Sequence, residues 1–274
     1  MQRHRPGFWQ IFTPEQAPLG PILIAGNDSD GEIARELMSS LAGYPMQLAI
    51  LAQDPEHSAW FPAGEDSHLE RFEFFETGRI LLEGTFEDYW ASRDSNLKKN
   101  LARRRRRLNE LGRIELVVHR SAEVMAACIR QFGILESSGW KGQEGSAVHE
   151  NNIQGRFYRD MFERFCATGE TLIFELLLDG KVIAVDLCLL RGDMLVALKT
   201  SFDETLKALS APIVMREDMI RLLYGEGQCK KIEFYGRVLE WQTKWISNTR
   251  GMYHINCHRN AMVSGIRSLV RSMR

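Results

Sequence analysis

The most informative candidates for chemistry are charged side chains that stand inside or directly beside apolar segments. Glu136 closes a predicted helix, and Trp140 and Lys141 follow it in a Gly-rich loop over 137–147. Loops held by a rigid scaffold commonly carry functional sites. A carboxylate there could hold or deprotonate an acceptor amine, and Lys141 could bind an acceptor carboxylate or phosphate. The competing interpretation is a surface loop anchored by a buried Trp140.

Two further charges, Asp186 and Lys199, occupy the middle of predicted apolar strands. If those strands are central, both charges face the interior or a cleft, and buried charges need partners. Together with Glu136 they are the candidate catalytic residues. The alternative is a solvent-facing pair on a half-open sheet; we favour a site role for Lys199 and leave Asp186 open between the two.

A run of five arginines, Arg103–Arg107, lies in a predicted helix over 96–111. At about 100° per residue, one stripe of this helix holds Leu97, Leu101, Leu108 and Leu111. Arg104 falls inside that stripe, so it should point inward and requires an anion, either a buried carboxylate or a ligand phosphate. For the other arginines a solvated face is favoured over a nucleic-acid site, because no interleaved aromatics offer base stacking.

Three strands and a helix are expected to position these residues. Hairpin signals separate the strands Thr171–Leu178, Lys181–Leu190 and Met194–Phe202. Asp179-Gly180, in the first connection, is the dipeptide that a type I′ turn favours. Ser210 as N-cap with Pro212 in the first turn then begins an apolar-periodic helix. The N–H groups at a helix N-terminus have no partner in the helix and suit a phosphate.

The composition is that of a soluble globular chain. The 274 residues are 44% hydrophobic and 26% charged, which allows one large or two small domains. The formal net charge is −1, but Ser95–Arg113 alone carries +7, so one face is expected to be strongly positive.

The sequence also indicates a compartment. Its five cysteines show no CxxC spacing, which predicts free thiols in a reducing environment. The N-terminus lacks the apolar core of a signal peptide, and no run of about 18 uninterrupted apolar residues occurs. We therefore expect a cytoplasmic protein.

A metal site is not expected. His254, Cys257 and His258 are close in sequence, but on the predicted strand His254 and Cys257 point to opposite faces. No second cluster of ligand residues completes a tetrahedral set around them.

The predicted elements from about Ile114 to His258 follow the order β-α-loop-α-β-β-β-α-β-β. This order resembles the GNAT acyltransferases, and more narrowly the CelD/BcsL group of polysaccharide-biosynthesis acetyltransferases, relatives of the Fem peptidyltransferases. The resemblance runs from about Gly84 to the C-terminus. The matching pieces are Phe86–Trp90, Asn96-Leu97, Leu135-Glu136 with Trp140–Gly142, Leu178–Gly180 with Ile183-Ala184, Leu198-Lys199 with Phe202-Asp203, Leu209-Ser210, Gly236 and Lys244-Trp245.

The resemblance implies an α+β, GNAT-like fold with a central mixed, largely antiparallel sheet flanked by helices. A truncated N-terminal αβ region, half-GNAT-like, would occupy 1–94, and a basic connecting helix 95–112. The acyltransferase domain, ending in a helix over Ala261–Met273, would occupy 113–274. The first twenty residues show little periodicity and are expected to be a mobile lead-in.

The resemblance further implies a thioester donor, acyl-CoA or acyl-carrier protein, where the strand Met194–Phe202 separates from the predicted strand Lys231–Tyr235 that follows the helix. Strand backbone around Lys199–Ser201 would pair with pantetheine, and the helix N-terminus would hold pyrophosphate. The cofactor-binding candidates are Thr200, Ser201, Ser210, Ala211, Ile213 and Val214. The substrate-binding candidates are Arg104, Trp140, Lys141, Asp203, Tyr235 and Lys244.

The chain departs from the family pattern at the phosphate loop. Ser210-Ala211-Pro212 replaces a Gly-rich sequence, the close approach that Gly permits is lost, and Pro212 has no N–H to donate. This departure weakens the case for CoA or shifts the donor towards a carrier protein.

These inferences predict an N-acyltransferase whose acceptor is a small-molecule amine, such as an amino sugar or amino acid of surface polysaccharide or lipid biosynthesis. No nucleophile signature is present, so direct attack of the amine on the thioester fits best. Two alternatives stay open. One is Fem-like aminoacyl transfer from tRNA, and the other is a non-catalytic scaffold that binds anionic polymer or an acidic membrane surface through the arginines. The oligomeric state is not determined.

Overall fold

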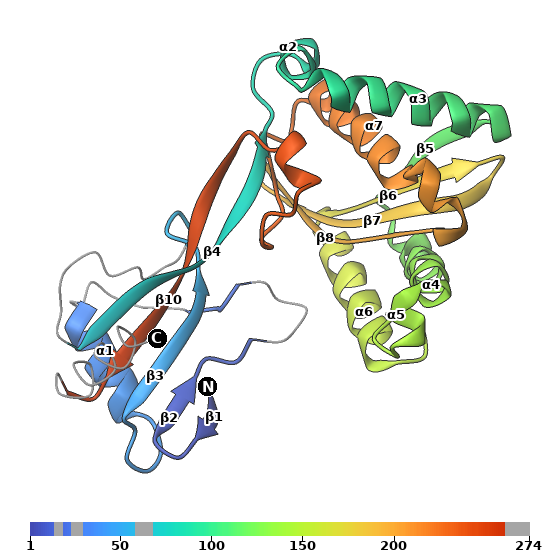
Figure 1. Ribbon diagram of the computed structural model, residues 1–274. Helices are drawn as coiled ribbons and strands as arrows, with labels where there is room; N and C mark the ends of the chain where they lie inside the picture. Colours follow the sequence, from blue (N-terminus) through green and yellow to red (C-terminus); the bar gives the residue numbers. More distant parts are fainter. Residues whose placement is uncertain (14–18, 23–29, 58–67, 261–274) are drawn as a thin grey trace. The chain divides into compact units, whose positions relative to one another are not determined.

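The computed structural model describes residues 1–13, 19–22, 30–57 and 68–260 (Figure 1). It divides into two compact units. The first comprises Met1–Gly78, Tyr235–Leu239 and Thr249–Arg274, and the second comprises Arg79–Phe234 and Glu240–Asn248. The predicted boundaries near 94 and 112 follow chain order, whereas the compact units are discontinuous in sequence. The predicted C-terminal helix, Ala261–Met273, lies outside the described residues.

The second unit is a mixed sheet with helices on both faces (Figure 1). The strand order is β4-β9-β8-β7-β6-β5, in which β5 to β8 are antiparallel neighbours and β8 runs parallel to β9. The strands are β4 (Leu69–Leu81, of which Arg79–Leu81 pair here), β5 (Ile114–His119), β6 (Thr171–Leu178), β7 (Lys181–Arg191), β8 (Met194–Phe202) and β9 (Lys231–Glu233). The predicted α+β class, with a mixed and largely antiparallel sheet, is confirmed.

Two groups of helices cover the sheet. Helices α3 (Ser95–Leu111) and α7 (Ala211–Glu226) lie on one face, and α4 (Ala122–Ser138) and α6 (Ile153–Ala167) lie on the other (Figure 1). The shorter helices are α2 (Phe86–Ala91), α5 (Trp140–Gln143) and the 3-10 turns Glu204–Leu209 and Gln242–Lys244. Because strand side chains alternate between faces, β7 supplies Ala184 to the core under α7 and Val185 to the core under α4.

The β6–β7 hairpin forms where the turn dipeptide predicts it. Asp179 and Gly180 have φ of 47° and 79°, and a type I′ turn requires positive φ at both central residues. The Asp179 carboxylate accepts a hydrogen bond of 2.7 Å from the Arg113 N–H. The hairpin tip is thereby tied to the start of β5.

Helix α7 begins at the predicted place but without the predicted cap. Ser210 adopts the left-handed conformation, with φ 49° and ψ 53°, and its side chain makes no capping hydrogen bond. The hydroxyl instead lies 3.4 Å from the Lys207 carbonyl, in the preceding 3-10 turn. The N-cap prediction is therefore right in position and wrong in chemistry, since that tight turn sets the backbone of Ser210.

The first unit contains β1 (Gln2–Arg5), β2 (Phe8–Gln10), α1 (Asp30–Ser39), β3 (Gln47–Gln53), most of β4 and β10 (Asn248–His258). The order is β1-β2-β3-β10-β4. The first twenty residues are not a lead-in without regular structure, as the expected mobile lead-in implied: Gln2–Gln10 form a hairpin turned at Gly7 (φ 74°). The exposed edge strand β1 has no hydrophobic alternation, and β2 is only three residues long, so the sequence pattern gives no signal for either strand. Of the helices within the described residues, none is long and apolar enough to span a membrane.

Two glycines allow the loop before α6 to reach the end of α4. A Cβ on Gly155 would collide with the His149 carbonyl oxygen, and one on Gly133 would lie 3.0 Å from the Val148 carbonyl oxygen. Asn152 caps α6 by accepting from the Gly155 N–H at 2.8 Å. The loop segment Val148–His149 can approach both helices closely because these positions lack side chains.

We expect Gly155→Ala to destabilise the protein by about 1–3 kcal/mol, the range for forcing a methyl group into a packed contact. Gly225→Ala in α7 is the matched control, because nothing lies within 4 Å of a Cβ there. This control should gain up to about 1 kcal/mol from the higher helix propensity of alanine. Urea unfolding of both variants measures the difference, and equal shifts would contradict the close approach.

Candidate functional site

The sequence-predicted residues of the central strands lie on opposite faces of the second unit's sheet. Lys199 pairs in register with Leu187, which packs under α4 and α6. Thr200 pairs with Asp186, whose partner Arg216 lies on α7. Lys199 and Thr200 are adjacent in sequence, but their side chains therefore lie on opposite faces of the sheet, at two different sites.

On the α4 face, the structure brings together Glu136, Lys141 and Lys199, here called the Glu136 cluster. Glu136 is 5% exposed, and its Oε1 accepts from Lys141 Nζ at 2.5 Å. Lys199 Nζ lies 3.3 Å from Oε1 and 3.4 Å from Oε2. The Val148 N–H donates to Oε2 at 2.7 Å. Two ammonium groups thus share one buried carboxylate, which leaves the cluster with a net positive charge.

The environment keeps Glu136 ionised. Burial raises the pKa of this carboxyl, but the hydrogen bonds from Lys141 and the Val148 N–H, with the charge of Lys199, bring it below its ordinary value. A carboxylate with a lowered pKa is a weak general base. The arrangement suits holding an ammonium group better than taking a proton from one.

Aromatic rings form the floor beneath Lys199. Its Nζ lies 5.9 Å from the ring centroid of Phe132 and 5.6 Å from that of Tyr158. Burial and the charge of Glu136 raise the pKa of Tyr158 to about 12, so its phenol keeps its proton. Trp140 is 55% exposed, with Lys141 Nζ 5.8 Å from its ring, so the interpretation of Trp140 as a buried anchor is wrong.

On the α7 face, Asp186 forms a buried ion pair with Arg216. Arg216 Nη2 donates to Asp186 Oδ2 at 2.8 Å, and the two side chains are 4% and 1% exposed. The guanidinium also lies 4.6 Å from the ring centroid of Trp241 and 5.5 Å from that of Phe234. Asp186 Oδ1 and Arg216 Nε are buried without a hydrogen-bond partner in the described part of the chain. Asp186 is therefore neither solvent-facing nor paired with Lys199.

A cavity of about 270 Å³, here called the Trp241 cavity, lies on the same face between α3, the first turn of α7 and the segment 240–245. Its lining residues are Leu97, Asn100, Arg104, Ile213, Glu240, Trp241, Lys244 and Trp245. Two cations and one carboxylate give the rim a net positive charge. Arg104, Ile213 and Lys244, three predicted site residues distant in sequence, thus meet at one cavity.

Hydrogen bonds to the backbone of Trp245 hold the wall of the Trp241 cavity in place. The Tyr89 hydroxyl donates to the Trp245 carbonyl at 2.8 Å, and Arg93 Nη1 donates to the same oxygen at 2.9 Å. The Trp245 side chain is 1% exposed. Both donors belong to α2 and its C-terminal flank, so this helix fixes the position of the 240–245 segment.

Adjacent arginines of α3 have different partners. Arg105 binds α7 through Asp218 at 2.7 Å and Glu217 at 2.8 Å. Arg104 is half-buried on the Trp241 cavity, and none of the described residues accepts a hydrogen bond from it. Burial, and then the charge of Arg103, lower its pKa. Of the two anions that the sequence allowed for Arg104, a protein carboxylate is not found among the described residues.

Beyond Val196, one edge of β8 pairs with no strand among the described residues; this unpaired edge is here called the opening beside β8. The parallel ladder with β9 covers only Met194–Val196 against Lys231–Glu233, and β9 ends there. Over Ala197–Phe202, β8 has no described strand on that edge. Alternate residues of a strand direct their N–H and C=O groups to each edge. This segment, which contains Thr200 and Ser201, can therefore offer backbone hydrogen bonds to a ligand.

The other predicted residues have structural surroundings. The Asp203 carboxylate accepts from Thr205, whose hydroxyl hydrogen bond is the largest cause of its lowered pKa, and it pairs with Lys181 at 3.0 Å. Ala211 and Val214 are buried in the core under α7. Tyr235 belongs to the first unit, where it is buried at φ 49° with Arg250 over its ring at 5.4 Å.

Sequence reasoning missed Arg216 and Trp241. A signal for Arg216 exists, because it is a cation inside the apolar run that starts α7, and Asp186 on its strand required a cation. Trp241 has no such signal, since its role depends on where the 240–245 segment returns.

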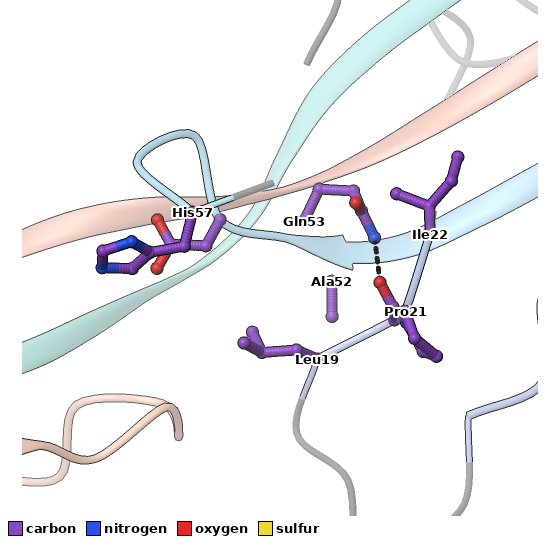
Figure 2. Close-up of a pocket in the computed structure, with 8 residues that line it drawn as sticks. Leu19, Pro21, Ile22, Ala52, Gln53 and His57 are labelled. Carbon is purple, nitrogen blue, oxygen red and sulfur yellow. Dashed lines mark hydrogen bonds between the residues drawn. The ribbon is translucent and has the colours of Figure 1, made fainter. Parts of the chain in front are cut away.

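The first unit has a cavity of its own, of about 260 Å³ (Figure 2). Leu19–Ile22, Ala52–Asp54 and His57 line it. Gln53 Nε2 donates to the Gly20 carbonyl at 2.7 Å across its wall. None of the sequence-predicted site residues lines this cavity.

A sequence profile for the acetyltransferase (GNAT) domain matches residues 95–243. No curated protein matches the chain in sequence. Among solved structures, the C-terminal domain of a putative lysylphosphatidylglycerol synthetase from Agrobacterium fabrum is similar with a TM-score of 0.55. That match has 12% identity and covers 87% of this chain and 75% of that one.

Two more solved structures are similar at the same level. A conserved protein of unknown function from Bacteroides thetaiotaomicron gives a TM-score of 0.55 at 12% identity, over 85% of this chain and 77% of that one. FemX gives 0.51 at 9% identity, over 86% and 79%. Likeness at such identities shows the fold alone, and it confirms the GNAT-like fold that the sequence predicts.

Removing Arg216 should be costly, because it leaves the Asp186 carboxylate buried without a cation. We expect Arg216→Met to destabilise the second unit by about 3–5 kcal/mol, and Asp186→Leu with Arg216→Met to recover most of that loss. Arg106→Met, at an exposed pair with Glu110, should change stability by under about 0.5 kcal/mol. Urea unfolding measures all three, and a small effect of Arg216→Met alone would refute the burial of the pair.

The lowered pKa of Glu136 predicts a pH dependence of stability. Below its ordinary value of 4.5, the unfolded chain takes up a proton at this group while the folded chain does not. The stabilisation is therefore complete above about pH 4.5 and is lost as pH falls through the folded pKa. Glu136→Gln should flatten the acid limb of the stability curve by up to about one proton equivalent. Parallel curves for wild type and variant in urea unfolding between about pH 3 and 7 would contradict this.

Proposed function

The chain belongs to the acetyltransferase (GNAT) domain family, and on that premise we propose that it is an N-acyltransferase that moves an acyl group from a thioester to an amine. The observation that carries the proposal is the opening beside β8, where a strand edge over Ala197–Phe202 continues past the end of β9. An extended donor arm with amide groups can add to such an edge as a strand would.

The Trp241 cavity is the proposed position for a charged or aromatic part of the donor. Arg104 and Lys244 supply positive charge, and Trp241 supplies a ring for stacking. At about 270 Å³ the cavity is slightly below the usual range for whole ligands. It therefore suits one part of acyl-CoA, or of the phosphopantetheine arm of an acyl-carrier protein. Pro212 lacks an N–H, so the N-terminus of α7 has one donor fewer for a phosphate. Arg104 and Lys244 would neutralise the donor phosphates instead.

The Glu136 cluster, on the opposite face, is the proposed acceptor side. Its carboxylate could hold an acceptor ammonium in exchange for one lysine, and the remaining ammonium groups could bind an acceptor carboxylate or phosphate. Exposed Trp140 next to Lys141 provides an apolar contact at the rim. This environment supports an acceptor that carries both an amine and an anionic group. An amino sugar or amino acid of surface-polymer synthesis fits, in keeping with the resemblance to the CelD/BcsL group.

The proposed reaction proceeds by direct attack. The acceptor ammonium first loses a proton to water, and the neutral amine adds to the thioester carbonyl while N–H groups of the β8 segment near Lys199–Ser201 stabilise the oxyanion. The C–S bond then breaks, the nitrogen loses its second proton to water or a carboxylate, and the thiolate takes up a proton from water and leaves as the thiol. No acyl-enzyme is required.

A second candidate is aminoacyl transfer, because the fold is similar to that of FemX and of a putative lysylphosphatidylglycerol synthetase domain. In this case the positive rim of the Trp241 cavity would bind the phosphates of an aminoacyl-tRNA end. The calorimetric binding experiment described below distinguishes a thioester donor from an aminoacyl-tRNA donor.

We expect Arg104→Ala to weaken acyl-CoA or acyl-carrier-protein binding by roughly 10–100-fold, the effect of one lost hydrogen bond to a charged group. The free energy of unfolding should stay within about 0.5 kcal/mol of wild type, since no described residue pairs with Arg104. Arg106→Ala, on the outer side of α3, should bind normally. The measurement is isothermal calorimetry of wild type, Arg104→Ala and Arg106→Ala, each titrated with acetyl-CoA, with an acyl-carrier protein and with aminoacyl-tRNA.

Binding of the tRNA alone would replace the thioester proposal by the aminoacyl one. Absence of heat with every donor would reject both and favour a non-catalytic scaffold. Equal losses in Arg104→Ala and Arg106→Ala would mean that the arginines act as a general positive surface rather than through the cavity.

A further inference from the structure

Three potential metal ligands meet on the α4 face of the sheet, at the edge away from the opening beside β8. They are His119 on β5, Glu175 on β6 and Cys128 on α4, and their ligand atoms all lie within 4.8 Å of one another. Glu175 pairs in register with Val117, two residues before His119, so the two side chains are diagonal neighbours on one face of the sheet. Cys128 belongs to the core cluster that packs on that same face.

We propose that His119, Cys128 and Glu175 bind one Zn²⁺ ion. An imidazole nitrogen, a thiolate and a carboxylate oxygen are the three ligand types that zinc takes in proteins. The mixed N, S and O set disfavours Mg²⁺ and Ca²⁺, which bind through oxygen ligands alone. The thiol proton is released to solvent as the S–Zn bond forms.

The spacing of the ligand atoms is close to that of a tetrahedral site. His119 Nε2 lies 2.9 Å from Glu175 Oε2, and bond lengths of about 2.0–2.3 Å require ligand atoms about 3.3–3.7 Å apart. The His119–Glu175 contact must open by about half an ångström, and a Cys128 distance at the 4.8 Å limit must close by about one. Side-chain rotations supply movements of this size without a change of the backbone. The ion would replace the hydrogen bond between His119 and Glu175 as the link between them.

The burial of the cluster also favours a cation. Glu175 is 6% exposed and Cys128 is 3% exposed, and His119 is the residue that pairs with this carboxylate. A divalent ion at this position would compensate the buried Glu175 carboxylate and a Cys128 thiolate together. The His119 side chain, 20% exposed, marks the side from which the ion and a fourth ligand, water, can enter.

Such a site would hold the edge strand to the rest of the sheet. Within the described strands β5 pairs only with β6, and the ion would connect both to α4. This role is independent of the proposed acyl transfer, because the cluster shares no residue with the Glu136 cluster or the Trp241 cavity.

The test uses the full chain, freed of any histidine tag, and measures binding of Zn²⁺ and Co²⁺ alone. We expect one equivalent of zinc per chain, a raised unfolding temperature, and a thiolate-to-metal charge-transfer band with Co²⁺. In Cys128→Val the band should vanish and the affinity should fall by more than about a hundredfold, beyond the effect of losing an outer-shell group. Cys229→Val, which removes a buried thiol from the other core cluster, should bind as wild type does.

Variants His119→Gln and Glu175→Gln keep the thiol and serve if Cys128→Val fails to fold. Each should weaken zinc binding while the circular dichroism of the metal-free protein stays native. The proposal is overturned if wild type binds no stoichiometric metal, if the Co²⁺ complex lacks a thiolate band, or if the three cluster variants bind as tightly as Cys229→Val. None of these outcomes bears on donor binding at the Trp241 cavity.

Discussion

A sheet covered by helices on both faces cannot leave a charge on its central strands without a partner, and the second unit is arranged around this constraint. Strands β6, β7 and β8 each carry one charged residue in their middle: Glu175, Asp186 and Lys199. Each is matched by a residue from a covering helix or the edge strand, and the partners are His119, Arg216 and Glu136. Removing any of these partners would leave a desolvated charge.

Buried ion pairs contribute little net stability compared with apolar residues of the same volume. Apolar residues in place of Glu175, Asp186 and Lys199 would therefore be compatible with the same core packing. Each pair also differs from a closed salt bridge. In the Glu136 cluster two ammonium groups contact one carboxylate, and within the described part of the chain Asp186 Oδ1 and Arg216 Nε have no hydrogen-bond partner. Glu175 contacts the His119 imidazole.

The end of the β8–β9 ladder leaves one edge of β8 without a paired strand among the described residues. A longer β9 would have continued the parallel pairing past Val196 and closed the edge of β8. Because β9 stops at Glu233, the chain turns away into the segment that carries Trp241 and Lys244. The end of β9 at Glu233 therefore has two consequences: the edge of β8 stays unpaired, and the following chain supplies one wall of the Trp241 cavity beside α7. Arg105, bound to Asp218 and Glu217, holds α3 against α7 and so keeps Arg104 at that cavity.

The sequence by itself determined the local elements and the need for partners. Local sequence patterns predicted the Asp179-Gly180 turn, the strands β6 to β8 and the buried leucines Leu97, Leu101 and Leu108 of α3. Leu111, predicted in the same stripe, is exposed at the end of the helix. A charged residue in the middle of a buried strand likewise predicts that an oppositely charged partner lies nearby. Arg104, Glu136, Asp186 and Lys199 could be singled out for this reason.

Only the tertiary structure decided which groups meet. Asp186 and Arg216 are 30 residues apart, His119 and Glu175 are 56 apart, and Lys199 and Glu136 are 63 apart. Strand register and helix docking set these contacts, and no short spacing encodes them. The residues His119, Cys128 and Glu175, which we propose as zinc ligands, likewise lie on three separate elements and show no spacing pattern in the sequence. Strand geometry also explains why the adjacent residues Lys199 and Thr200 serve opposite faces of one sheet.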